Sequence, residues 1–255
     1  MSSQPARASE HLPRHRRRRP FDLVNLLYWR RPPVTRPQEF VAVFTSHPQP
    51  YIGAYSPLSW PDFVDYRNAA RTTRLVAYRS TWTSVDARNG AEGSEVYLVT
   101  GEFFSALGIR PALGPLLGRV DDRAGASPVA VMGHARWVEL GSDPGIVGRS
   151  VRVGDLVVQV VGVAPPGFRG MLAGSGVALL LPAETGPGNV LETEREDPTR
   201  HAWSVFARLP PGVSAAHLQG ELAATASRLD LPLSLRPPGR RSLRRQSRRR
   251  APGAI

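Results

Sequence analysis

The segment SVRVGDLVVQVVGV, residues 150–163, carries the strongest strand signal in this chain. Valine fills both of its arms, and β-branched residues favour extended backbone because their side chains pack well on a pleated surface. Gly154 and Asp155 separate the arms, and a two-residue reversal that contains glycine is typical of a β-hairpin. The segment therefore predicts strands at residues 150–153 and 156–163.

Shorter apolar segments on both sides of this hairpin predict further strands and helices. One helix should begin after Ser59, whose hydroxyl can cap its first turn, and another after Ser214, with Leu218 and Leu222 at helical spacing. The remaining strand predictions are residues 75–84, 95–99, 128–132, 177–181 and 203–209, with a turn at residues 90–93. Because strands and helices alternate irregularly, the predicted fold class is α+β, with mixed sheets and short helices.

Two short helices are predicted inside this pattern. Thr100 is expected to cap the first, and Gly108 to end it in the left-handed conformation that glycine adopts without strain. Its inward-facing residues should be Phe103, Phe104 and Leu107. The second helix is predicted at residues 133–140, with Trp137 on its buried side.

The charge of the chain is concentrated at its two ends. The formal net charge is +12, and every one of the 33 basic residues is arginine. Residues 1–36 contain nine arginines and two acidic residues, residues 231–255 contain eight arginines and no acidic residue, and the rest contains 16 arginines and 19 acidic residues. We therefore predict disordered arginine-rich tails at residues 1–23 and 231–255 around one folded domain at residues 24–230.

The composition excludes several chemistries. Without lysine the chain has no P-loop lysine and no Schiff-base amine, and without cysteine it has no disulfide, no thiolate nucleophile and no cysteine-bound metal. No apolar run approaches the roughly 18 to 20 residues that span a bilayer, so no membrane span is expected in this chain.

The polar groups that could form a site have simpler explanations. Asp121 and Asp122 form an acidic pair that is expected to lie on a surface turn. Gly174-Ser175-Gly176 lacks the flanking pattern of a nucleophile elbow and is expected to be a turn. An acidic loop, expected to be solvated because it lacks the ligand spacing of a calcium-binding loop, consists of Glu192, Glu194, Glu196 and Asp197. The histidines, which lack metal-ligand spacing, are His11, His15, His47, His134, His201 and His217. We therefore predict no catalytic residue, no metal site and no cofactor.

Five segments, taken in order, resemble the extracytoplasmic core domain of MacB/FtsX-type ABC transporter permeases, especially the large orphan permeases. They are SWPDFVDYR at residues 59–67, VTGEFFSALGIRPALG at 99–114, PVAVMGHARW with DPGIVGR at 128–149, VVGVAPPGFRG at 160–170 and RLPPGVS at 208–214. Each segment alone is weakly specific because Pro and Gly turns are common, but their shared order makes the resemblance stronger. It covers roughly residues 24–230.

The resemblance implies a noncatalytic domain that couples conformational change to substrate or partner proteins, at the extracytoplasmic face of the cell membrane. It further implies an ABC ATPase, membrane permease subunits and a periplasmic protein as partners. The sequence departs from the family where membrane helices should flank the domain, although VNLLYWR at residues 24–30 resembles the exit from such a helix. We therefore expect an excised domain or a fragment of a permease.

Two other classes of protein compete with this interpretation. The arginine-rich ends would suit a basic-tailed nucleic-acid-associated protein, whose affinity falls steeply as salt rises. Nucleic acid is nevertheless not expected as a partner, because the central part of the chain carries more acidic than basic residues. A small hydrolase or metal enzyme would need convergent histidine and carboxylate groups, which the sequence does not bring together.

Overall fold

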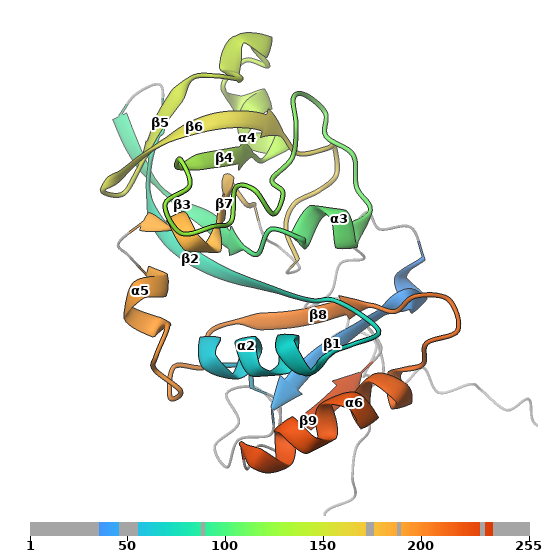
Figure 1. Cartoon of the computed structure of the whole chain (residues 1–255). Coiled ribbons are helices and arrows are strands. Elements are labelled where there is room, and N and C mark those ends of the chain that lie inside the picture. Colours follow the sequence, from blue (N-terminus) through green and yellow to red (C-terminus); the bar gives the residue numbers. More distant parts are fainter. Residues whose placement is uncertain are drawn as a thin grey trace, which may run out of the picture.

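One long strand, β2 (Leu75–Ala87), runs through both lobes of the fold (Figure 1). The computed structural model describes residues 36–45, 56–87, 90–171, 176–187, 190–229 and 233–236. The first residues of β2 pair with β8 (Ser204–Arg208) in the lower lobe. Its later residues pair with β3 (Gly90–Val99) in the upper lobe, so a single strand belongs to both sheets.

The lower lobe is a four-stranded antiparallel sheet with two helices on one face. Its order is β2-β8-β1-β9, where β1 is Phe40–Thr45 and β9 is Leu233–Arg236. Helix α2 (Trp60–Ala69) connects β1 to β2, and α6 (Ala215–Arg228) connects β8 to β9. Each pair of parallel strands has one antiparallel strand between its members, which is the split βαβ arrangement.

The upper lobe is inserted between the two split βαβ units and closes on itself. Its strand order is β2-β3-β7-β4-β6-β5, and the pairing of Val85 with Val153 returns β5 to β2. The strands are β4 (Val129–Met132), β5 (Ser150–Val153), β6 (Leu156–Val163) and β7 (Leu179–Pro182). Parallel and antiparallel pairs both occur, so the sheet is mixed and the predicted α+β class is confirmed.

Several short helices complete the fold. They are η1 (Pro37–Glu39), α3 (Phe103–Leu107), α4 (His134–Glu139), η2 (Pro144–Ile146), η3 (Ala183–Thr185) and α5 (Val190–Glu194). Within the described ranges, no helix is both long and apolar enough to span a bilayer.

Two clusters of buried side chains hold the lobes together. The first lies between the sheet and helices α2 and α6 and continues into the interior of the upper lobe, from Phe63 and Leu218 to Val160. The second is rich in aromatic rings and covers the opposite face, where Phe103 packs against Phe206 with ring centroids 5.9 Å apart. Since both clusters extend across the two lobes, apolar burial favours one fixed arrangement of the lobes.

Several local predictions with a named physical cause are confirmed. The 150–163 segment forms β5 and β6, with Gly154 at φ 61° in the turn between them. Ser59 accepts a hydrogen bond from the amide of Asp62 at the start of α2. Ser214 caps α6 in the same way, and Gly108 ends α3 at φ 66°.

Two predictions about local structure are wrong. Residues 90–93 belong to β3 rather than to a turn, because the hairpin with β2 extends to the pairing of Ala87 with Gly90. Thr100 does not cap α3; its hydroxyl accepts a hydrogen bond from the amide of Ala77 instead. Trp137 packs half-buried against the first cluster, on the buried side of α4 as predicted, although α4 has no fully buried residue.

The sheet also contains strands that the sequence did not predict. β1 is one of them, and β9 lies within residues 231–255, a range for which a disordered tail was predicted. Pairing of β9 with β1 extends the sheet beyond residue 230, where the predicted folded domain ends.

Candidate functional site

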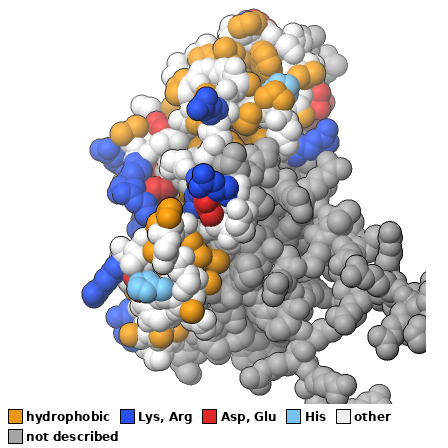
Figure 2. Space-filling model, turned by 90° about the vertical axis from the view of Figure 1, so that its right-hand side faces the viewer, with side chains coloured by type: hydrophobic (Ala, Val, Ile, Leu, Met, Phe, Trp, Pro, Cys, Tyr) orange, Lys and Arg blue, Asp and Glu red, His pale blue; other side chains and the backbone are white. Residues whose placement is uncertain are grey.

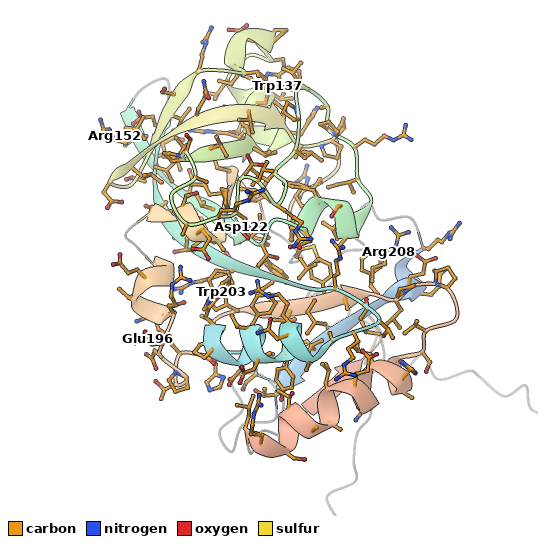
Figure 3. The ribbon with its side chains drawn as sticks, in the orientation of Figure 1. Asp122, Trp137, Arg152, Glu196, Trp203 and Arg208 are labelled. Atoms are coloured by element: carbon orange, nitrogen blue, oxygen red, sulfur yellow. The ribbon has the colours of Figure 1, made fainter. Side chains whose placement is uncertain are left out.

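A group of connected polar and aromatic side chains lies at the junction between the two lobes, around Trp203 (Figure 3). Trp203 precedes β8, and its ring packs on Trp60 of α2 with a centroid distance of 4.6 Å. Its indole Nε1 donates a hydrogen bond of 3.0 Å to Glu194 at the end of α5. The junction therefore joins α2, α5 and the start of β8 through two large aromatic rings and one carboxylate.

Glu194 is the centre of a buried ion-pair network. Its side chain is only 1% exposed, and it pairs with Arg79 of β2 and, at 2.8 Å, with Arg200. The prediction of a solvated acidic loop is wrong for this residue. Local sequence placed Glu194 among other acidic residues, but Arg79, which compensates its charge, lies 115 positions away.

The other acidic residues of this segment have ordinary roles. Glu192 and Glu196 are exposed, and Glu196 lies beside α5 (Figure 3). Asp197 accepts hydrogen bonds from the amide and the hydroxyl of Thr199, and these bonds lower its pKa. These three residues lie at the surface, as predicted for this loop.

Asp121 and Asp122 fix the loop that follows α3. Asp121 accepts a hydrogen bond from the amide of Gly118, and Asp122 accepts one from Gly101 and one from Glu184, at 2.8 and 3.1 Å. Burial raises the pKa of Asp122, although the two backbone amides act in the opposite direction. The pair is predicted as a surface turn. Asp122, which Figure 3 labels, also connects this loop to η3 through its hydrogen bond from the amide of Glu184.

The histidines do not converge. His134 contacts the ring of Trp137 in the upper lobe, His217 pairs with Glu221 on α6, and His201 lies near the carbonyl of Pro57. His11, His15, His47, Gly174 and Ser175 lie outside the described residues. Within the described ranges, no group of three or more His, Cys, Asp or Glu residues could hold a metal ion.

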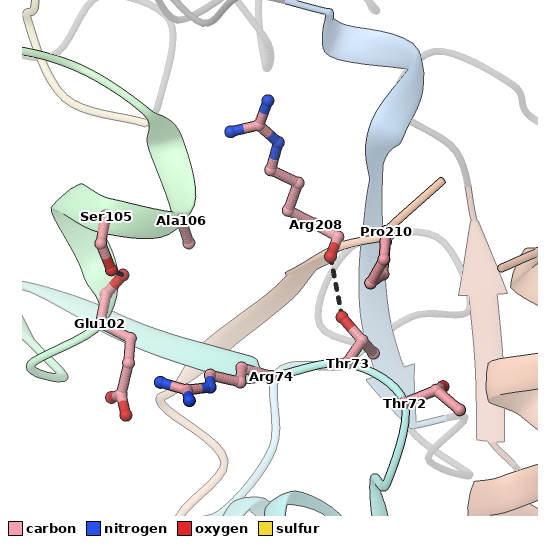
Figure 4. Close-up of a pocket in the computed structure, with 8 residues that line it drawn as sticks. All are labelled: Thr72, Thr73, Arg74, Glu102, Ser105, Ala106, Arg208 and Pro210. Atoms are coloured by element: carbon pink, nitrogen blue, oxygen red, sulfur yellow. Dashed lines mark hydrogen bonds between the residues drawn. The ribbon is translucent and has the colours of Figure 1, made fainter. Parts of the chain in front are cut away.

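Two open pockets lie at the junction. The first, of about 320 Å³, is lined by Thr72, Thr73, Arg74, Glu102, Ser105, Ala106, Arg208 and Pro210 (Figure 4). The second, of about 360 Å³, is lined by Trp60, Pro61, Val64, Asp65, Arg67, Glu184 and Arg195. In the first pocket the Thr73 hydroxyl donates to the carbonyl of Arg208 and the Ser105 hydroxyl to the carbonyl of Glu102. Both of these hydroxyls therefore bond to backbone carbonyl oxygens.

Several residues of the five family-like segments serve to pack the fold. A Cβ atom on Gly162 of β6 would lie 2.0 Å from the carbonyl oxygen of Pro115, and one on Gly114 would lie 2.3 Å from that of Val161. The loop after α3 can therefore lie against β6 only because both positions are glycine. Phe104 and Phe168, also from these motifs, belong to the aromatic cluster.

A family model described as the MacB-like periplasmic core domain matches residues 33–225. This chain belongs to that family. Together with the solved structures, the family supports an extracytoplasmic domain of an ABC-type permease, as the motif resemblance implies.

Solved structures of the same fold come from distant bacteria. The periplasmic region of MacB from Actinobacillus actinomycetemcomitans is 14% identical with a TM-score of 0.58, over 78% of this chain and 89% of that one. A domain of a putative permease protein from Porphyromonas gingivalis is 18% identical with a TM-score of 0.57, over 80% and 92%. The extracellular domain of the noncanonic ABC-type transporter YknZ from Gram-positive bacteria is 11% identical with a TM-score of 0.52, over 77% and 99%. No match was found among curated protein sequences.

Proposed function

We propose that this chain is a noncatalytic extracytoplasmic domain that relays conformational change between an ABC transporter system and its substrate or partner proteins. The observation that carries the proposal is the continuity of β2 through both lobes, together with the buried contacts of Glu194 beside it. The mechanism is movement of packed elements, and no bond is made or broken.

The geometry suits such a relay. A displacement of the lower sheet acts directly on the upper lobe, because the residues of β2 that pair with β8 and those that pair with β3 are in one strand. Arg79 lies on β2 itself, and Glu194 connects it to Trp203 beside β8. Close-packed interiors transmit strain because they have low compressibility.

The proposal also covers the partners of the chain and its place in the cell. An ABC ATPase and membrane permease subunits are the partners of the parent system, and a further partner protein would contact the extracytoplasmic surface. The chain would act at the extracytoplasmic face of the cell membrane. The supporting argument is its membership of the MacB-like periplasmic core domain family.

In-cell photo-crosslinking tests the proposed partners. A photoreactive amino acid is introduced at Trp82, which is 73% exposed in the upper lobe, or at Ala223, which is exposed on α6. We expect irradiation of the source cells to link one of these positions to an ABC permease or ATPase subunit in the membrane fraction. Crosslinks only to cytoplasmic proteins or nucleic acid would contradict the proposal and would favour the basic nucleic-acid-associated protein. The matched control places the reagent at Phe63, which is fully buried and should give no crosslink.

A further inference from the structure

Four arginines lie at or beside the first pocket, and we call them the arginine face: Arg36, Arg74, Arg119 and Arg208. Arg74 and Arg208 line the pocket itself. Arg36 shares Glu39 with Arg208, and Arg119 pairs with Glu102 on the pocket wall. Figure 2 looks toward this side and shows groups of arginine side chains near the level at which the two lobes meet.

The guanidinium groups of this face remain accessible to a ligand. The side chains of Arg36 and Arg119 are 66% and 67% exposed, and that of Arg208 is 31% exposed. Arg74 is also exposed, and no ion pair of Arg74 occurs within the described residues. An exposed cation without a carboxylate partner is free to bind an anion.

The nearby carboxylates are already engaged. Hydrogen bonds from Arg208 and Arg36 lower the pKa of Glu39. Glu102 pairs with Arg119, and Glu221 accepts hydrogen bonds from the backbone amides at residues 71 and 72. The four guanidinium groups of the face therefore share two carboxylates, Glu39 and Glu102, although residues 37–230 as a whole contain more acidic residues than arginines.

The start of β1 and the end of β9 lie near each other, beside the arginine face. Phe40, the first residue of β1, pairs with Arg208, and Arg236, the last residue of β9, pairs with Ala42. The arginine-rich sequences before residue 36 and after residue 236 are therefore attached beside the arginine face.

We propose that the arginine face binds the phosphate groups of acidic lipids at the membrane surface. This inference rests on the proposed function, because an extracytoplasmic domain of a permease works next to a lipid headgroup layer. Guanidinium groups suit phosphate because their planar N–H donors can bind two oxygens at once. Each arginine near an anionic membrane strengthens binding by about 5-fold at moderate salt.

A membrane fits this face better than a nucleic acid does. Proteins that bind single-stranded nucleic acid stack the bases on aromatic side chains. Among the exposed large apolar residues of the described ranges, the one aromatic is Trp82, which is not among the residues that line the pocket. The arginine face offers charge and hydrogen-bond donors without a stacking platform, and lipid phosphates require no such platform.

Vesicle binding with the purified full-length chain tests the proposal. Affinity is measured for phosphatidylcholine vesicles with and without about 30% phosphatidylglycerol. Arg74→Ala should weaken binding to the acidic vesicles by about 5-fold, and Arg74→Ala with Arg119→Ala by about 25-fold. The matched control is Arg152→Ala, because Arg152 is exposed on β5, far from Arg208 (Figure 3), and leaves the same tails in place. Unchanged melting temperatures of the variants show that they are folded.

Three results would overturn the proposal. The first is equal affinity of the Arg74→Ala and Arg152→Ala variants for acidic vesicles. The second is equal binding to vesicles that lack acidic lipid, and the third is loss of vesicle binding when a short oligonucleotide competes at equal phosphate concentration. Because the assay contains only the chain and lipid, such failure would leave the photo-crosslinking result intact. A failed photo-crosslinking test would conversely leave the measured vesicle affinities unchanged.

Discussion

Replacing the carboxylate of Glu194 by an amide is expected to destabilise the protein by about 3 kcal/mol. The Glu194 side chain is almost fully buried and pairs with Arg79, which is itself only 15% exposed. In Glu194→Gln the guanidinium of Arg79 stays at the junction without its anion, and an uncompensated buried charge typically costs about 3 to 5 kcal/mol. We take the lower limit because Arg200, the second cation, is 57% exposed and can turn to water.

Thermal and chemical denaturation measure this effect. For a domain of this size, a loss of about 3 kcal/mol lowers Tm by roughly 6 to 12 °C. Arg200→Ala is the matched control, because an exposed partner of the same carboxylate should contribute less than about 1 kcal/mol. The double variant Arg79→Met with Glu194→Leu should recover part of the stability, since apolar residues of similar volume can replace a buried ion pair.

A small loss of stability in Glu194→Gln would contradict the importance of this ion pair. If Glu194→Gln and Arg200→Ala destabilise the protein equally, by less than about 1 kcal/mol, the network at the junction is not important for stability. The same conclusion would follow if the double variant were less stable than Glu194→Gln. In either case the two lobes would depend on apolar contacts alone.

Three further substitutions test other parts of the structure. Gly162→Ala should destabilise the protein by about 1 to 3 kcal/mol, because the added Cβ would overlap the carbonyl oxygen of Pro115. Gly93→Ala, with open space around it, is the control and should be nearly neutral. Equal effects of the two substitutions in urea unfolding would show that Gly162 does not lie so close to Pro115. Tyr66→Phe should be neutral or stabilising by about 1 kcal/mol, because the buried hydroxyl of Tyr66 has no hydrogen-bond partner among the described residues. Burial also raises the pKa of this hydroxyl to about 12. A loss of stability above about 1 kcal/mol in urea unfolding would show that the hydroxyl does make a hydrogen bond. Burial raises the pKa of Asp122 above 3.8, so stability that is present below pH 3.8 is lost as the pH rises through the folded-state pKa. The stability of Asp122→Asn relative to wild type should therefore increase as the pH rises above 3.8, and a constant difference would show that Asp122 does not titrate this way.

The elements that could be predicted from sequence are those with local causes. The turn at Gly154, the cap at Ser59 and the left-handed Gly108 each act within a few residues, and each is where the sequence indicates. Strand β9 is different because its sequence is short and is followed by prolines and arginines. It forms by pairing with β1, almost two hundred positions earlier, and no local pattern indicates that pairing.

The candidate site was less predictable for the same reason. Glu194 is one of several acidic residues in its segment, and only the fold brings Arg79 and the Trp203 indole to it. The arginines of the arginine face come from four separate segments of the chain. The sequence alone did not indicate this cluster, because most of the excess of arginine lies at the two ends of the chain.

The extracytoplasmic position of the domain can be measured directly by single-cysteine labelling. The natural chain contains no cysteine, so Ala124→Cys, at an exposed loop position, provides one unique thiol. A maleimide that cannot cross membranes should label this thiol in intact source cells as fully as it does after lysis. Labelling that requires lysis would place the domain in the cytoplasm and would contradict a role on the outer side of an ABC permease.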